Sequence, residues 1–173
     1  MDHSTTQLVM VSVGTDHHPF DRLVSWMDAW AGDHQEVEVI IQYGSADVPT
    51  NTKGDALLQH DRLRNLFARA DVVVSHGGPS TVMDARMAGR IPIVVARNPA
   101  YGEHVDGHQM VFANHLQRHD MAILAATQDQ LYEAVESGLA DPTRTALPVS
   151  DDALPAGVVA FGRHVDGLLR ARQ

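Results

Sequence analysis

The sequence contains no cysteine among its 173 residues. Folds built on disulfides, catalytic thiolates and cysteine-ligated zinc are therefore excluded, and a reducing compartment is permitted. Long apolar runs are also missing, since the longest, residues 91–96, is far too short to cross a bilayer. The first residues, MDHSTTQ, lack the basic and apolar blocks of a signal peptide. We therefore expect a cytoplasmic protein.

Positive charge is scarce. Lysine and arginine together number 13, against 22 aspartates and glutamates, and the formal net charge is −9 at pH 7. Because nucleic-acid binding needs a broad basic surface, we expect no nucleic-acid partner, and any anion must be bound locally. Arginines do cluster over residues 163–172, a pattern more typical of a solvated helix face than of a docking surface.

Two common nucleotide-binding fingerprints are absent as well. Neither GxxxxGKS nor GxxxxGKT occurs, which excludes a P-loop NTPase. The first loop reads GTDHHP instead of GxGxxG, which disfavours a conventional dinucleotide site. In this loop His17 and His18 are candidates for acid–base chemistry, although simple exposure is the more common state of such residues.

What the chain does contain is a regular alternation of two patterns. Short β-branched runs alternate with stretches whose apolar residues recur at helical spacing, which predicts an α/β, Rossmann-like doubly wound parallel sheet in a single domain. Strands are expected at residues 8–13, 37–42, 56–58, 72–74, 91–96 and 121–125. Helices are expected after Pro19, around 63–67, and at 79–89, 108–116 and 128–137, completing a core at 8–137. A linker is expected at 138–155 and an amphipathic terminal helix at 156–171.

The ends of the expected strands carry residues suited to a ligand site. Ligands in doubly wound sheets bind at the carboxyl ends of the strands. Gly14, Tyr43, His76 and Arg97 all follow expected strands, so they should line one crevice.

The sequence DVVVSHGGPSTVMDARMAG, residues 71–89, combines a buried strand, a double glycine and a helix start. Pro79 suits the first helical position, and Ser80 or Thr81 can cap the free N–H groups there. Bare N–H groups and the positive end of the helix dipole point at one spot, so we expect a phosphate at this turn. The helix should bury Val82, Met83 and Met87.

A carboxylate follows the double glycine at a useful distance. Gly77 and Gly78 permit close backbone approach to a ligand, and Asp84 lies one helical turn beyond Ser80. A carboxylate can accept hydrogen bonds from both hydroxyls of a ribose, so a nucleoside could span the phosphate site and Asp84. The alternative is a tight strand-to-helix turn with capping residues and a solvated Asp84.

A second polar cluster, GEHVDGHQ, occupies residues 102–109. His104 and His108 stand four apart beside carboxylates, as in some metal sites. The two glycines break the helix that this spacing would require, so we expect no metal. A loop that opens into a helix at His108 and Gln109 fits hydrogen bonding to sugar hydroxyls and phosphate better.

Three motifs in order, VGTDHHPFDRL, HGGPST with its following Asp, and GEHVDGHQ, give the chain a resemblance over residues 8–135. It resembles the C-terminal domain of family 28 glycosyltransferases. More closely, it is similar to the stand-alone soluble subunit of split bacterial exopolysaccharide glycosyltransferases. That subunit is akin to the soluble half of the two-subunit N-acetylglucosaminyltransferase that elongates dolichol-linked glycans in eukaryotes. The resemblance implies the donor-binding half of a GT-B fold.

The resemblance also implies which residues bind the donor, without metal or cofactor. Asp84 would take the ribose, at a position where the family usually has Glu, and His108 with Gln109 would contact the donor sugar or the β-phosphate. Gly14 and Thr15 would form the opposite wall, and Glu103 is counted with the donor-binding set. The residues implied around the diphosphate are His76, Gly77, Gly78, Ser80 and Thr81, and the family often has Gly in place of Ser80.

The implied activity is inverting transfer of a sugar from a nucleotide sugar, commonly a UDP-sugar, to a lipid-linked acceptor. In full-length relatives the base comes from an acceptor-binding domain that this chain lacks. We therefore expect a membrane-anchored partner subunit that supplies acceptor and base and recruits this chain to the inner face of the membrane. Two alternatives are a nucleotide-sugar-binding regulatory module without transfer activity and a sugar-nucleotide epimerase, which would need both halves in one chain.

Overall fold

A computed structural model describes residues 6–147 of the chain. The strands are β1 (Leu8–Ser12), β2 (Glu38–Gln42), β3 (Lys53–Asp55), β4 (Val72–Ser75), β5 (Ile93–Val94) and β6 (Ile123–Leu124). The α-helices are α1 (Asp21–Asp33), α2 (His60–Arg69), α3 (Pro79–Met87), α4 (His108–Arg118) and α5 (Gln128–Ala140), with short 3-10 helices η1 (Pro99–Tyr101) and η2 (Pro142–Arg144). The expected terminal helix at 156–171 lies outside the described residues.

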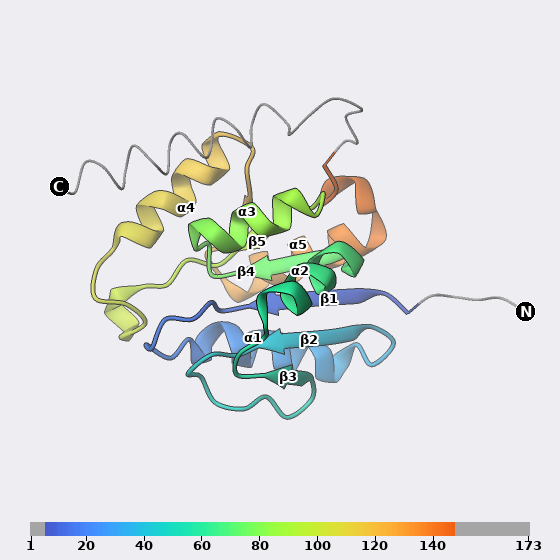
Figure 1. Ribbon diagram of the computed structural model, residues 1–173, viewed down its shortest axis with the longest axis horizontal. Coiled ribbons are helices and arrows are strands. Elements are labelled where there is room, and N and C mark those ends of the chain that lie inside the picture. The colour runs from blue at the N-terminus through green and yellow to red at the C-terminus, as the bar shows by residue number, and fades with distance from the viewer. Residues whose placement is uncertain (1–5, 148–173) are drawn as a thin grey trace, which may run out of the picture.

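The strands form one parallel sheet in the order β3-β2-β1-β4-β5-β6 (Figure 1). Each strand is followed by a helix or a long loop that returns to the other end of the sheet, as parallel pairing requires. The predicted fold class, an α/β Rossmann-like sheet, is confirmed. No helix among residues 6–147 is long and apolar enough to cross a membrane.

Helices cover both faces of the sheet. Successive residues of a strand point to opposite faces, and β1 is buried on both. Val9 and Val11 pack in the apolar cluster that contains α1 and α5, whereas Leu8 and Met10 pack in a second cluster with α2. A third cluster joins α3 and α4 over β5. The core is therefore a three-layer sandwich with β1 and β4 at its centre.

The first helix buries the expected face. Phe20, Leu23, Val24, Met27 and Trp30 are all almost fully inaccessible to solvent. The helix itself begins at Asp21, after Pro19 and Phe20 have turned the chain back along the sheet.

The third strand lies earlier than expected. Residues 56–58 were the expected strand, but β3 is Lys53–Asp55, where it pairs with Ile40–Gln42 of β2. Leu58 is instead a buried core residue in the turn before α2. An added Cβ on Gly54 would collide with the carbonyl oxygen of Ile41, so this glycine permits the close pairing.

Three further expectations are corrected. The fifth strand shortens to Ile93–Val94, and α5 runs through Ala140 into the expected linker. Within the expected linker, Ala146 forms an isolated antiparallel β-bridge with Arg90. Met87 is 50% exposed because Ala85 and Arg86 take the inner face of α3, and Arg86 donates there to the carbonyl oxygen of Met121 at 2.9 Å.

Candidate functional site

The segments of the expected site meet at one edge of the sheet. Parallel strands end together, so the loops after β1, β4 and β5 and the first turns of α3 and α4 gather at the left end of the sheet in Figure 1. The motifs GTDHHP, HGGPST and GEHVDGHQ all lie there. This edge is where doubly wound sheets bind ligands.

His76 forms the floor between two glycine turns. A Cβ added to Gly14, whose φ is +78°, would lie 2.5 Å from Cε1 of His76, and one added to Gly78 would collide with Nε2 of the same ring. Burial and the nearby positive charge of Arg97 lower the pKa of His76 to about 4. The ring is therefore a neutral packing element at pH 7 that fits only because both neighbours are glycines.

The first turn of α3 is open to a ligand. Its N-cap is Gly78, which has no side chain to accept from the first-turn N–H groups, and Pro79 carries none. The backbone N–H groups of Ser80 and Thr81 thus remain at the positive end of the helix dipole. Ser80 is exposed and Thr81 is buried. Gly77, with φ +82°, brings this turn against Val94, where an added Cβ would lie 2.7 Å from Cγ1.

Asp84 lies between α3 and the start of α2. Its side chain is 16% exposed, and its Oδ2 is 3.9 Å from Nδ1 of His60. Sequence reasoning did not identify His60, because nothing in the spacing of two residues on different helices indicates that those helices pack side by side. The pair is a polar patch one turn away from the open N-terminus of α3.

Glu103 is placed behind the site instead of in it. Glu103 is 3% exposed to solvent. Its carboxylate accepts from Nε and Nη2 of Arg22 at 2.7 and 2.8 Å, and from the backbone N–H of Asn98 at 2.7 Å. Because protein donors occupy both oxygens, Glu103 holds the loop at residues 97–107 against α1.

Arg97 was expected to line the crevice because it follows a strand, but it is a buried positioning residue. It is fully buried and donates to three backbone carbonyls: Nη2 to Val13 at 2.8 Å, and Nη1 to His18 at 2.7 Å and to Glu103 at 3.0 Å. Burial lowers the pKa of Arg97, although a guanidinium stays protonated in proteins. The loops after β1 and β5 are thereby tied together.

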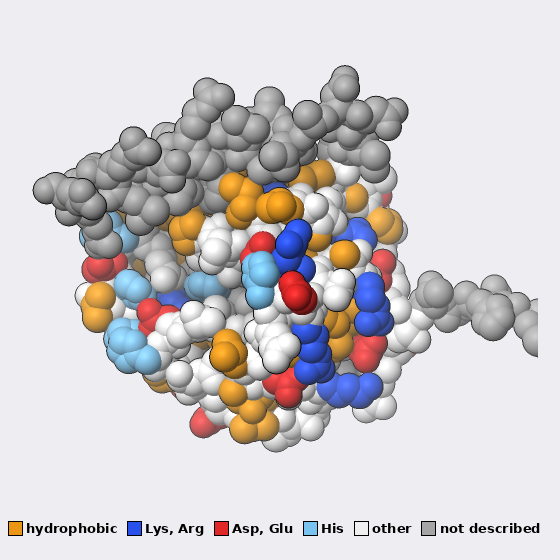
Figure 2. Space-filling model, viewed as in Figure 1, with side chains coloured by type: hydrophobic (Ala, Val, Ile, Leu, Met, Phe, Trp, Pro, Cys, Tyr) orange, Lys and Arg blue, Asp and Glu red, His pale blue; other side chains and the backbone are white. Residues whose placement is uncertain are grey.

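Histidines and aspartates from these two loops form a continuous network. Nδ1 of His18 lies 2.6 Å from Oδ1 of Asp16, and Nε2 of His104 lies 3.7 Å from Oδ2 of the same carboxylate. Asp106 then connects His104, at 3.4 Å, with His108, at 2.9 Å. Figure 2 shows pale blue histidine side chains gathered over this edge of the molecule.

The start of α4 contributes two of the expected residues. His108 is 78% exposed and points its polar ring toward solvent beside Asp106. Oε1 of Gln109 is buried and has no hydrogen-bond partner among the residues that the structure describes. Buried acceptors are normally paired, so this oxygen is available to a ligand that reaches it.

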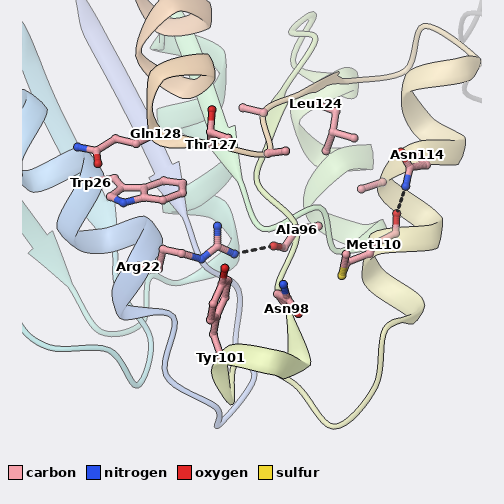
Figure 3. A pocket seen from close by; sticks show the side chains of 13 residues that line it. Arg22, Trp26, Ala96, Asn98, Tyr101, Met110, Asn114, Leu124, Thr127 and Gln128 are labelled. Carbon is pink, nitrogen blue, oxygen red and sulfur yellow. Dashed lines mark hydrogen bonds between the residues drawn. The ribbon is translucent and has the colours of Figure 1, made fainter.

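A separate cavity of about 370 Å³ is lined by residues of α1, of the loop at residues 97–107, of α4 and of the start of α5 (Figure 3). Arg22 lies between Trp26 and Tyr101, with its guanidinium carbon 4.9 and 5.3 Å from the two ring centroids. None of the expected donor-binding residues, all of which the structure describes, lines this cavity. Its wall is Arg22, Trp26, Ala96, Asn98, Tyr101, Met110, Ala113, Asn114, Leu124, Ala125, Ala126, Thr127 and Gln128.

Solved structures with this arrangement are glycosyltransferases. The chain is similar to the glycotransferase of kitacinnamycin (TM-score 0.63, 17% identity, covering 83% of this chain and 37% of that chain). It is also similar to the calicheamicin glycosyltransferase CalG4 (TM-score 0.59, 17% identity, covering 81% of this chain and 36% of that chain). A third similar structure is MurG of Acinetobacter baumannii (TM-score 0.53, 18% identity, covering 84% of this chain and 44% of that chain). These likenesses show the fold, one half of a GT-B architecture.

The chain spans well under half the length of the solved structures it matches. No curated protein matches its sequence. A family model, the glycosyltransferase family 28 C-terminal domain, matches residues 8–154. Because that match covers most of the chain, the protein belongs to glycosyltransferase family 28 and carries the C-terminal domain of that family.

Proposed function

We propose that this chain is the donor-binding half of an inverting glycosyltransferase that moves a sugar from a nucleotide sugar, UDP-linked, to a lipid-linked acceptor in polysaccharide or glycan biosynthesis. One observation carries the proposal: the uncapped N-terminus of α3 opens beside the glycine turns at Gly14 and Gly78, in a domain of a glycosyltransferase family. A helix end without its own acceptor is a ready diphosphate site.

The donor lies along the edge of the sheet in this proposal. The diphosphate accepts from the N–H and hydroxyl groups of Ser80 and Thr81, and its approach depends on the bare backbone of the double glycine. The ribose hydroxyls donate to Asp84, beside His60. His108 and Gln109 face the donor sugar or the β-phosphate, and the unpartnered Oε1 of Gln109 accepts from a hydroxyl of the donor sugar. Gly14 and Thr15 form the opposite wall.

The chemistry follows from charge. As the bond between sugar and phosphate breaks, negative charge grows on the leaving diphosphate, and preorganised N–H donors at the end of α3 stabilise it. Inversion requires direct displacement by an acceptor hydroxyl, and a base must remove the proton of that hydroxyl. We assign the base and the acceptor to a membrane-anchored partner subunit that holds this cytoplasmic chain at the inner face of the membrane. The chain covers 36–44% of the length of the matched structures, so the acceptor-binding half of their fold lies outside the matched region.

Nucleotide binding by the purified full chain tests the donor half of the proposal. UDP should raise the melting temperature of the chain, and Asp84→Asn should lower UDP affinity at least about tenfold, the effect of losing one hydrogen bond to a charged group. Asp129→Asn, on the exposed first turn of α5, is the matched control and should bind UDP as the wild type does. If UDP, ADP and GDP all leave the melting temperature unchanged, the chain is not a nucleotide-binding subunit.

Transfer separates an enzyme subunit from a regulatory module. Co-expression with a membrane-anchored protein that carries an acceptor-binding half should give transfer of labelled sugar from UDP-sugar to a lipid-linked acceptor. Asp84→Ala and His108→Ala should abolish the transfer without unfolding the chain. Normal transfer by both variants would show that the donor site is assigned wrongly.

A further inference from the structure

We infer that Asp16, His17, His18 and His104 form a binding site for a divalent transition-metal ion with a preference for nitrogen and oxygen ligands, such as Zn²⁺. The site lies where the loop after β1 meets the loop after β5. It uses a different residue set from the His104 and His108 pair considered above, and it stands independently of the proposed donor chemistry.

Ligand atoms in the first loop already have suitable spacing. Asp16, His17 and His18 each offer one ligand atom, and these three atoms lie within 4.8 Å of one another. Oδ1 of Asp16 is 2.6 Å from Nδ1 of His18 and 3.9 Å from Nδ1 of His17. Zinc bonds of about 2.0–2.2 Å in a tetrahedron separate ligand atoms by roughly 3.3 Å, a value between the two observed distances.

A fourth ligand comes from a distant part of the chain. Nε2 of His104 is 3.7 Å from Oδ2 of Asp16, and the ring centroids of His18 and His104 are 5.8 Å apart. His104 is not one of the residues whose ligand atoms lie within 4.8 Å of one another, so it becomes the fourth ligand only when its ring turns toward the ion. Three imidazoles and one carboxylate are then a set of the kind that zinc selects. Spacing along the chain could not reveal it, because the two loops meet only in the folded sheet.

The backbone under this set is held by one buried side chain. Nη1 of Arg97 donates to the carbonyl oxygens of both His18 and Glu103, the latter being the neighbour of His104. The two loops that supply the ligands are therefore fixed relative to each other before any ion binds. Preorganisation by groups outside the ligand shell commonly contributes 10–100-fold to metal affinity, in order of magnitude.

The charge of the site also suits a cation. Oδ1 of Asp16 accepts from the backbone N–H of His18 at 2.8 Å, and an aspartate carboxylate is an anionic, acceptor-only ligand at pH 7. Arg97 opposes a cation, yet its Nη1 and Nη2 donate to backbone carbonyls, which leaves the carboxylate oxygens of Asp16 to the ion.

His17 has little structural function of its own. Its side chain is 87% exposed, and its ring lies 4.0 Å from that of His18. Without metal, the N–H at Nδ1 of His18 donates to Oδ1 of Asp16 at 2.6 Å. In the metal-bound state the neutral ring carries its proton on Nε2, which frees Nδ1 as a ligand. Protons compete for the imidazole nitrogens, so metal binding weakens in acid.

Metal titration of the purified full chain tests the inference without any nucleotide. After removal of metals with a chelator, Zn²⁺ should bind at one equivalent by calorimetry, and Co²⁺ should give the strong visible absorption of a tetrahedral site. Asp16→Asn, His18→Gln and His104→Gln should each lower Zn²⁺ affinity at least about tenfold. His60→Gln, in the first turn of α2 with its side chain 65% exposed, is the matched control and should bind as the wild type does.

If a variant at one of the less exposed ligands fails to fold, His17→Gln still tests Zn²⁺ binding. Its side chain is 87% exposed, so the exchange should not destabilise the fold. Circular dichroism of each variant checks the fold. Absence of saturable Zn²⁺ binding, or unchanged affinity in folded His17→Gln and Asp16→Asn, would overturn the inference. Neither result bears on UDP binding, so the metal site and the donor site fail separately.

Discussion

The imidazole of His76 occupies the space where a side chain at Gly14 would begin. Only 2.5 Å would separate a Cβ at Gly14 from Cε1 of the ring. The loop after β1 and the loop after β4 therefore touch through a glycine and a buried neutral histidine. This contact sets the distance between the two walls of the proposed donor site.

Gly14→Ala should destabilise the fold by about 2–5 kcal/mol, because it adds the cost of a positive φ to that of overpacking against His76. Gly102→Ala is the matched control. Its φ is +72°, close to the +78° of Gly14, but nothing lies within 4 Å of an added Cβ, so about 1–2 kcal/mol is expected. Urea unfolding of both variants isolates the contact with His76. Equal losses would mean that the backbone alone matters.

The Arg22–Glu103 pair is a second relationship with an energetic consequence. The two side chains are 19% and 5% exposed, so Glu103→Gln should cost about 3–5 kcal/mol by leaving a guanidinium with an unmatched charge. Glu38→Gln breaks the exposed pair with Lys53 and should cost less than about 1 kcal/mol. Denaturant midpoints compare the two variants. A small loss for Glu103→Gln would show that water reaches the pair.

The central strands could be predicted because they are buried on both faces and read as continuous apolar runs. Residues 8–12 and 72–75 are of this kind. Lys53–Asp55 could not be predicted, since this short edge strand contains no apolar residue and is defined only by its pairing with β2. Its sequence, KGD, is more typical of a turn.

In the candidate site too, some features could be predicted from the sequence and others could not. The motifs themselves predicted a helix start at Pro79 and another at His108, because proline and glycine act locally. The expected side-chain cap at Ser80 or Thr81 is absent, since Gly78 is the N-cap of α3. The partners of those motifs could not be found this way. Arg22 meets Glu103 across 81 positions, and Arg97 meets Val13 across 84. Such contacts depend on the order of strands in the sheet, which residue spacing does not encode.

Stability should fall in acid because of His76. Burial lowers its pKa from 6.5 to about 4, so the unfolded chain takes up a proton between these values while the folded chain does not. The stabilisation is fully present above pH 6.5 and is lost as the pH falls toward 4, by about 3 kcal/mol at most. Urea midpoints at pH 7 and pH 4.5 should differ more in the wild type than in His76→Gln. The same pH dependence in both proteins would assign the effect to other groups.

Ser80→Asp separates the stability of α3 from its proposed function. A carboxylate in the first turn interacts favourably with the helix dipole, so the variant should be about as stable as the wild type or more stable by roughly 0.3–1 kcal/mol. The same charge lies where the diphosphate would bind and repels it. We therefore expect loss of UDP-induced stabilisation in a chain that melts no lower than the wild type. Ser80→Ala, which keeps the N–H group and adds no charge, should retain most UDP binding. If Ser80→Asp binds UDP normally, the diphosphate does not lie at the start of α3.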